Sequence, residues 1–169
     1  MVFALAGESS KFMNNAELVL DDRIMFHYYA TGITPAMAKP MVGKGSVYAI
    51  AAHDANNNYL DGSKTYSVTM KAPVPVNNFW SFMVYNNQTR SILETDQKTG
   101  GLDSNAKGLK ADKDGSVTIY FAPKAPKGHE SNWIQTIPGK GYNVLLRLYG
   151  PLQPWFDKTW MPGDFKLVK

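Results

Sequence analysis

The 169-residue chain contains no cysteine, which excludes disulfide bonds, thiol nucleophiles and thiolate metal sites. Charged residues make up only 19% of the sequence, below the average of about 25% for globular domains. No stretch approaches the roughly 18 consecutive apolar residues of a membrane-spanning helix. The opening MVFALAG also lacks the basic start and the long apolar core of a signal peptide. We therefore expect a folded chain without a membrane span, and no signal peptide is recognised.

The basic excess of the chain is small and scattered. Eighteen Lys and Arg residues against fourteen Asp and Glu residues give a net charge of +4. A nucleic-acid-binding protein usually gathers its Lys and Arg residues in a stripe or patch, whereas here they lie singly in turn-like stretches. The sequence therefore predicts no nucleic-acid partner, and the length fits one structural domain.

Most of the chain has the two-residue period of β-strands. Runs rich in Val, Ile, Thr, Tyr, Phe and Trp are separated by Gly, Pro, Asn and Asp turn signals, with no alternating helices. This order predicts a mainly β protein, an antiparallel β-sandwich of jelly-roll type. The predicted strands cover residues 47–53, 64–70, 79–86, 116–121 and 142–149.

The N-terminal region has a helical period instead. Apolar residues recur at steps of three and four between residues 11 and 31, which predicts an amphipathic helical segment. We expect residues 1–44 to form this segment and a loop that packs on the sandwich, and residues 45–169 to form the sandwich itself. An ordered C-terminal tail that carries Trp155, Phe156 and Trp160 should lie over it.

The strand at 79–85 is apolar on both sides. Trp80, Phe82 and Val84 point one way, while Phe79, Met83 and Tyr85 point the other way. The pattern predicts burial on both faces. The cover for the second face is expected to be the N-terminal helix or a separate domain.

The strongest metal signal is incomplete. Asp54, Asn56 and Asn58 match the first three ligand positions of a calcium loop, but Tyr59 replaces its glycine and Thr65 replaces its bidentate Glu. The sequence therefore predicts a polar hairpin loop, no metal site and no cofactor. The chain has three histidines, His27, His53 and His129. No two of them are spaced like the histidine ligands of a metal site, so they do not change this conclusion.

Polar residues crowd just after the doubly apolar strand, between residues 86 and 97, where they need partners. The candidate catalytic residues are Arg90, Glu94 and Asp96: Arg90 would bind an anionic or hydroxyl-rich group, and Glu94 or Asp96 would act as acid or base. Asp96 or Asp157 is the expected carboxylate partner of Arg90. The candidate ligand-binding residues are Asn87, Arg90, Trp133, Gln135 and Trp160, the two tryptophans by stacking.

The segment YNNQTRSILETDQ at 85–97 resembles the signature of a bacterial family catalogued as domain of unknown function 1214. The other matching stretches follow in the same order: DDRIMFHYYATGITPAM at 21–37, YLDGSKTY at 59–66, NWIQTIPGKGY at 132–142 and LRLYGPLQPWFDKTW at 146–160. The resemblance implies a jelly-roll-like β-sandwich that forms the C-terminal half of two-domain proteins, whose N-terminal half belongs to family 1254. It implies no settled activity, substrate or cofactor.

The resemblance also bears on partners and compartment. It suggests a periplasmic or secreted protein, and it makes this chain either a natural short form or a piece of a two-domain protein. The leading interpretation is a non-catalytic module that works through domain packing, with a separate N-terminal family domain, or through assembly as a homo-oligomer. The alternative is a hydrolase or lyase that acts on a polar substrate such as a carbohydrate.

Overall fold

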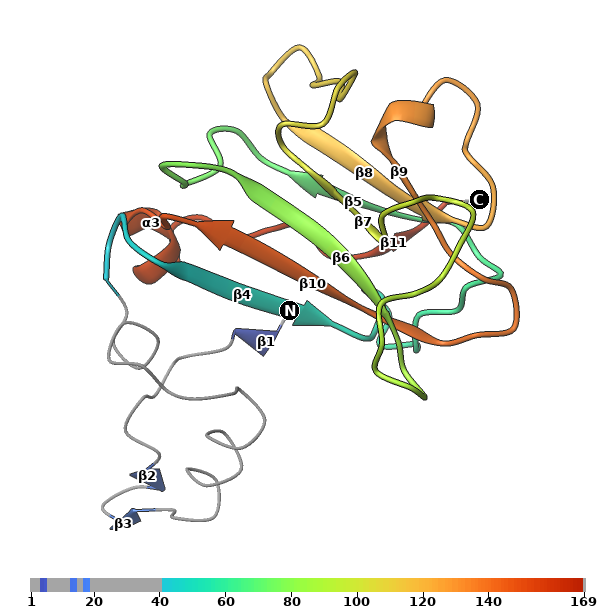
Figure 1. Cartoon of the computed structure of the whole chain (residues 1–169). Helices are drawn as coiled ribbons and strands as arrows, with labels where there is room; N and C mark the ends of the chain where they lie inside the picture. Colours follow the sequence, from blue (N-terminus) through green and yellow to red (C-terminus); the bar gives the residue numbers. More distant parts are fainter. Residues whose placement is uncertain (1–3, 6–12, 15–16, 19–40, 169) are drawn as a thin grey trace.

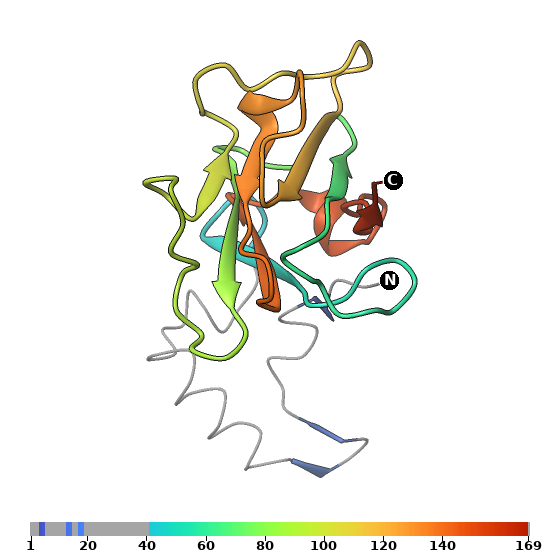
Figure 2. The same ribbon diagram turned by 90° about the vertical axis from the view of Figure 1, so that its right-hand side faces the viewer.

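A computed structural model of the chain describes residues 4–5, 13–14, 17–18 and 41–168. Its strands form two main sheets, which Figures 1 and 2 show in views at right angles. The first sheet has the order β1-β4-β10-β6-β7, with β1 at Ala4–Leu5, β4 at Ser46–Ala51, β10 at Tyr142–Tyr149, β6 at Trp80–Asn86 and β7 at Gly101–Asp103. The second has the order β11-β5-β8-β9, with β11 at Lys166–Leu167, β5 at Tyr66–Met70, β8 at Val117–Ala122 and β9 at Trp133–Gln135.

The core lies between the two sheets because each long strand turns every second side chain inward. On β6 and β10 buried and half-buried residues alternate without a break. Phe82 from the first sheet meets Phe121 from the second edge to face, with ring centroids 5.7 Å apart. Phe121 also contacts Phe165 from the C-terminal tail at 4.9 Å. The core is therefore shared by both sheets and the tail.

The prediction of a mainly β chain is confirmed, and each of the five predicted strands coincides with β4, β5, β6, β8 or β10 to within about two residues. The prediction of purely antiparallel order is wrong at one place, because β8 and β9 pair in parallel. The chain returns between them through a loop that contains the short 3-10 helix η1 at Glu130–Asn132, instead of a tight hairpin.

The outward face of the first sheet corrects a second expectation. The residues of β6 that point away from the core, among them Met83 and Tyr85, are half-buried, so this strand is fully buried on one face only. On β4 the outward residue Ile50 is 41% exposed. The apolar pattern on this face therefore marks a surface, not a second core.

The predicted N-terminal helix lies mostly outside the described residues. Within its range, β2 at Met13–Asn14 and β3 at Glu17–Leu18 pair as two short antiparallel strands. The prediction of a helix is therefore wrong for these four residues. The expected packing of residues 1–44 on the sandwich also lies largely outside the described residues. Within residues 4–5, β1 extends the first sheet by pairing with β4 at Ala49 and Ile50.

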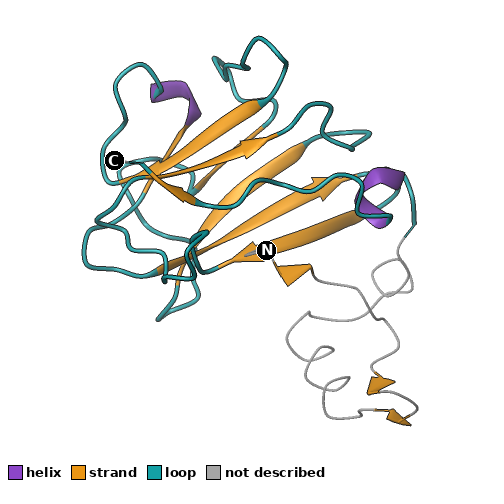
Figure 3. Cartoon of the chain, turned by 180° about the vertical axis from the view of Figure 1, so that it is seen from behind, coloured by secondary structure: helices purple, strands orange, loops and turns teal. Residues whose placement is uncertain are grey.

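The C-terminal tail packs against the sandwich. After β10 the chain forms the short helix α3 at Gln153–Phe156, which lies at the opposite end of the sandwich from η1 (Figure 3). Trp155 and Trp160 are buried, at 5% and 8% exposure, and belong to the core cluster. The indole N–H of Trp160 donates to the carbonyl of Lys71 at 2.9 Å.

Across the residues that the structure describes, no helix is long and apolar enough to span a membrane.

Candidate functional site

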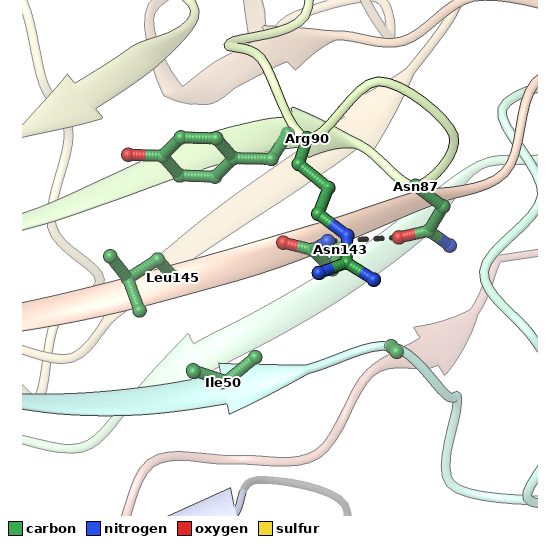
Figure 4. Close-up of a pocket in the computed structure, with 7 residues that line it drawn as sticks. Ile50, Asn87, Arg90, Asn143 and Leu145 are labelled. Atoms are coloured by element: carbon green, nitrogen blue, oxygen red, sulfur yellow. Dashed lines mark hydrogen bonds between the residues drawn. The ribbon is translucent and has the colours of Figure 1, made fainter. Parts of the chain in front are cut away.

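The polar segment after β6 borders two separate open hollows. The first, of about 500 Å³, lies on the outward face of the first sheet and is hereafter the Arg90 hollow (Figure 4). Three strands or their ends supply its floor, and the turn after β6 supplies its polar rim. Its lining residues are Ile50, Ala52, Tyr85, Asn87, Arg90, Asn143 and Leu145.

A buried asparagine builds the turn that carries Arg90. Asn86, the last residue of β6, is 7% exposed, and its side-chain oxygen accepts hydrogen bonds from the backbone N–H groups of Gln88 at 2.8 Å and Thr89 at 3.4 Å. The backbone N–H of Arg90 then donates to the carbonyl of Asn86 at 2.8 Å. Arg90 adopts φ +60°, a left-handed conformation that non-glycine residues rarely take. The turn therefore fixes where the arginine side chain begins.

The guanidinium of Arg90 has no carboxylate partner among the described residues; the ion pair between Lys64 and Asp61, at 3.8 Å, involves neither candidate partner. The expected pairing of Arg90 with Asp96 or Asp157 is therefore wrong. Asp96 bonds to Gln135 instead, at 3.0 Å, and Asp157 accepts the backbone N–H and the hydroxyl of Thr159 at 3.1 and 2.8 Å. Asp157 thus satisfies a local turn, whereas Asp96 bonds to a side chain 39 positions away, a partner that sequence spacing did not reveal.

The second hollow, of about 520 Å³, contains the candidate acids and Gln135. Gln135 holds the loop after β6 against β9: its side chain accepts the N–H of Asp96 at 3.0 Å and donates to the Asp96 carboxylate at 3.0 Å. Gln97 adds a second bridge, from its side-chain nitrogen to the carbonyl of Trp133 at 3.2 Å. The lining residues are Glu94, Thr95, Asp96, Pro123, Lys124, Gln135, Thr136, Ile137 and Pro138.

The structure thus divides the predicted site residues. Asn87 and Arg90 line the first hollow, whereas Glu94, Asp96 and Gln135 line the second. The two candidate tryptophans line neither hollow. The indole N–H of Trp133 donates to the carbonyl of Ala122 at 2.8 Å, and Trp160 is buried in the core cluster.

Sequence reasoning missed Asn143, whose side-chain amide donates to the Asn87 side-chain oxygen at 2.9 Å, drawn as a dashed line in Figure 4. The two residues are 56 positions apart. The alternation of β10 places Asn143 and Leu145 on one face, but only the pairing of β10 with β6 and β4 brings them beside Tyr85 and Ile50.

The loop that resembles a calcium site is an asparagine and aspartate turn. One carboxylate oxygen of Asp54 accepts the backbone N–H groups of Asn56 and Asn58, each at 2.9 Å. Burial acts to raise the pKa of Asp54, but the hydrogen bonds from Asn58 and Asn56, with the charge of Lys64, outweigh burial and lower this pKa. Within the described part of the chain, no group of three or more His, Asp or Glu side chains is placed to hold a metal ion.

Comparison with known proteins finds similar solved structures and one matching family. No curated protein matches it. A crystal structure of the VPA0106 protein from Vibrio parahaemolyticus is similar, with 28% identity and a TM-score of 0.67 over 85% of this chain and 34% of that one. A putative uncharacterised protein from Burkholderia cenocepacia is 22% identical, with a TM-score of 0.48 over 86% of this chain and 39% of that one.

This chain therefore spans about a third of the length of the Vibrio protein. Residues 45–153 match the family described as "Protein of unknown function (DUF1214)", and these residues include β4 to β10 and both hollows. Because this match covers more than half of the 169 residues, the chain belongs to the DUF1214 family.

Proposed function

We propose that this chain is a non-catalytic packing module that docks a further protein domain on the outward face of its first sheet. One observation carries the proposal: the outward side chains of β4, β10 and β6 are mostly apolar or aromatic and remain half-exposed or exposed. Ile50, Leu145 and Met83 form a row straight across the three strands, because Leu145 pairs with both of the others. Contiguous apolar surface of this kind marks interaction sites.

The charge of this face defines the partner further. Arg147 lies between the rings of Tyr48 and Tyr149, with its guanidinium carbon 5.1 and 4.5 Å from their centroids. The outward positions of β4, β10 and β6 hold no Asp or Glu. A complementary surface would therefore be apolar with acidic groups at its rim.

The occupant that we propose is a separate domain rather than a second copy. In the Vibrio protein, about two thirds of the length lies outside the region similar to this chain. The resemblance to two-domain proteins implies an N-terminal domain of family 1254 as the neighbour. An antiparallel sheet commonly packs one face on a core and leaves the other face free, so the apolar row on the free face supports such a neighbour.

The test is the association state of the purified chain. Without its neighbour the exposed face should self-associate, so the mass measured by light scattering should rise with concentration above 18.8 kDa. Met83→Lys places a charge at the β6 end of the row and should restore a monomer, because a second copy on this face would bury the ammonium group. Ile50→Lys, at a residue that is 41% exposed, is a second variant that should fold in any case.

The matched control is Leu167→Lys. Leu167 is 47% exposed but lies on β11, at the edge of the second sheet, so this variant should associate like the original chain. A chain that stays monomeric at every concentration and binds no apolar dye would refute the packing proposal. Equal effects of the Leu167 and Met83 variants would refute the choice of face.

We also propose that the sandwich is of the jelly-roll type. The proposal is supported by β4, β5 and β6, which alternate between the two sheets, and by β10, which lies between β4 and β6. A late strand that returns to lie beside an early one is a feature of Greek-key folds. An experimental structure with β10 at a sheet edge would contradict this assignment.

The hydrolase or lyase alternative stays a prediction. It needs Arg90 and a carboxylic acid to act on one substrate, and no feature of the described residues supports such an arrangement. Arg90 lines one hollow, whereas Glu94 and Asp96 line the other.

A further inference from the structure

The Arg90 hollow combines a cation with unused hydrogen-bond donors. Its polar rim consists of Arg90, Asn87 and Asn143, and no acidic residue lines it. Asn87 accepts from Asn143 through its side-chain oxygen, so its own NH₂ group keeps both hydrogens for another partner. In the described part of the chain, no hydrogen bond or ion pair engages the Arg90 guanidinium. The rim is therefore built to receive an acceptor that carries negative charge.

The turn holds the backbone of Arg90. The buried side chain of Asn86 ties the turn at Gln88 and Thr89, and the positive φ of Arg90 directs its side chain back over the sheet, toward Asn143 (Figure 4). Left-handed conformations at non-glycine residues are costly and persist where surrounding contacts impose them, often at ligand sites. The turn thus fixes the backbone of Arg90 so that its side chain starts at one side of the hollow.

The floor of the hollow is apolar. Ile50 and Leu145 lie opposite each other on β4 and β10, with Ala52 beyond the end of β4 and the Tyr85 ring from β6. Figure 4 shows Ile50 and Leu145 side by side on neighbouring strands, at one side of the Arg90 side chain. A ligand that satisfied the rim would therefore lay an apolar part across these two side chains.

We propose that the Arg90 hollow binds a small carboxylate that carries an apolar chain or ring. The planar guanidinium forms two parallel hydrogen bonds to a carboxylate, the Asn87 amide donates a third, and the apolar part of the ligand covers Ile50 and Leu145. The hollow shares Ile50 and Leu145 with the docking row, whereas Met83, at the β6 end of the row, does not line it. Ligand binding and docking therefore use overlapping surface and are tested separately below.

The experiment is an NMR titration of the full chain with hexanoate as the probe and hexan-1-ol as the neutral analogue of equal length. Hexanoate should shift the signals of residues around the hollow in a saturable way, and hexan-1-ol should bind at least about tenfold more weakly, because it loses the charge-assisted bonds. Arg90→Met should weaken hexanoate to the level of the alcohol. Arg90→Lys should recover only part of the affinity, because an ammonium cannot form the bidentate pair.

Lys166→Met is the control for the loss of one positive charge. Lys166 is exposed on β11 in the second sheet, so hexanoate binding should not change. Arg90 is exposed, so the Arg90 variants should fold, and their melting temperatures confirm it. Equal binding of hexanoate and hexan-1-ol, hexanoate binding that survives Arg90→Met, or no saturable shift would each overturn the proposal.

Repeating the titration in the Met83→Lys background separates this proposal from the packing proposal. If that monomeric variant binds hexanoate and loses it with Arg90→Met, the hollow is a ligand site whatever the association state. If hexanoate never binds but Arg90→Met weakens self-association, the carboxylate that Arg90 recognises belongs to a protein surface, and the small-ligand proposal is wrong.

Discussion

The hydroxyl of Tyr142 offers the sharpest test of the packing between the sheets. Tyr142 is 1% exposed, and its hydroxyl is the one buried side-chain polar atom without a hydrogen-bond partner in the described part of the chain. Burial, followed by the nearby Tyr66 and Asp61, raises the pKa of Tyr142 well above its ordinary value. The hydroxyl therefore lies in a place that disfavours polar and charged groups.

Tyr142→Phe should stabilise the protein. An unsatisfied buried polar group costs about 1–3 kcal/mol, and the substitution removes that group while it keeps the ring. We expect the free energy of unfolding to rise by about 1 kcal/mol, with a melting temperature about 2–4 °C higher for a domain of this size. Urea unfolding followed by tryptophan fluorescence measures both variants under the same conditions.

Tyr66→Phe is the matched control, because Tyr66 is also fully buried but its hydroxyl accepts the backbone N–H of Asp61 at 3.4 Å. The same substitution should there lower the free energy of unfolding by about 0.5–1.5 kcal/mol. The opposite signs distinguish hydrogen bonding from ring packing, since both substitutions remove one oxygen from a buried tyrosine. A Tyr142→Phe variant that loses 1 kcal/mol or more would refute the reasoning and reveal a partner for this hydroxyl.

Three further predictions concern the turns and the tail. Folding lowers the pKa of Asp54, so its carboxylate stabilises the protein at pH values above the unfolded-state pKa of about 3.9. This stabilisation is lost as the pH falls through the lower folded-state pKa. Asp54→Asn should therefore flatten this part of an acid-unfolding curve, and an unchanged curve would contradict the prediction. Gly62→Ala should lower the free energy of unfolding by about 1–3 kcal/mol, because an added Cβ would collide with the carbonyl of Ile137. At Gly141 an added Cβ would meet its neighbours at an ordinary 3.4 Å or more, so Gly141→Ala should melt near the original temperature. Trp160→Ala should cost about 3–5 kcal/mol through lost core packing, and an unchanged thermal melt would show that the tail does not stabilise the sandwich.

The candidate site was only partly visible in the sequence. The polar run after the strand at 79–86 singled out Asn87 and Arg90, and the structure places both at one hollow. It wrongly paired Arg90 with a carboxylate, because Asp96 and Asp157 satisfy nearby groups that spacing does not show. Asn143 could not be found at all, since it reaches Asn87 through strand pairing and not through proximity in the chain.

Local chemistry explains what the sequence by itself determined. A two-residue period specifies an extended strand and its inward face, and Gly, Asn and Asp specify where strands end. The mainly β class and the positions of β4, β5, β6, β8 and β10 follow from these signals. The short strands β7, β9 and β11 give no such signal, because two or three residues are too few to show a period.

Only the tertiary structure decided which faces are covered and which side chains meet. The strand at 79–85 reads as apolar on both sides, yet one side faces the core and the other forms a half-exposed surface. Burial depends on what packs against a face, and that is set by strand order: β10 lies between β4 and β6 although the chain reaches it last of the three. The same order assembles the Arg90 hollow, because it brings Ile50, Tyr85 and Asn143 from three strands onto one face.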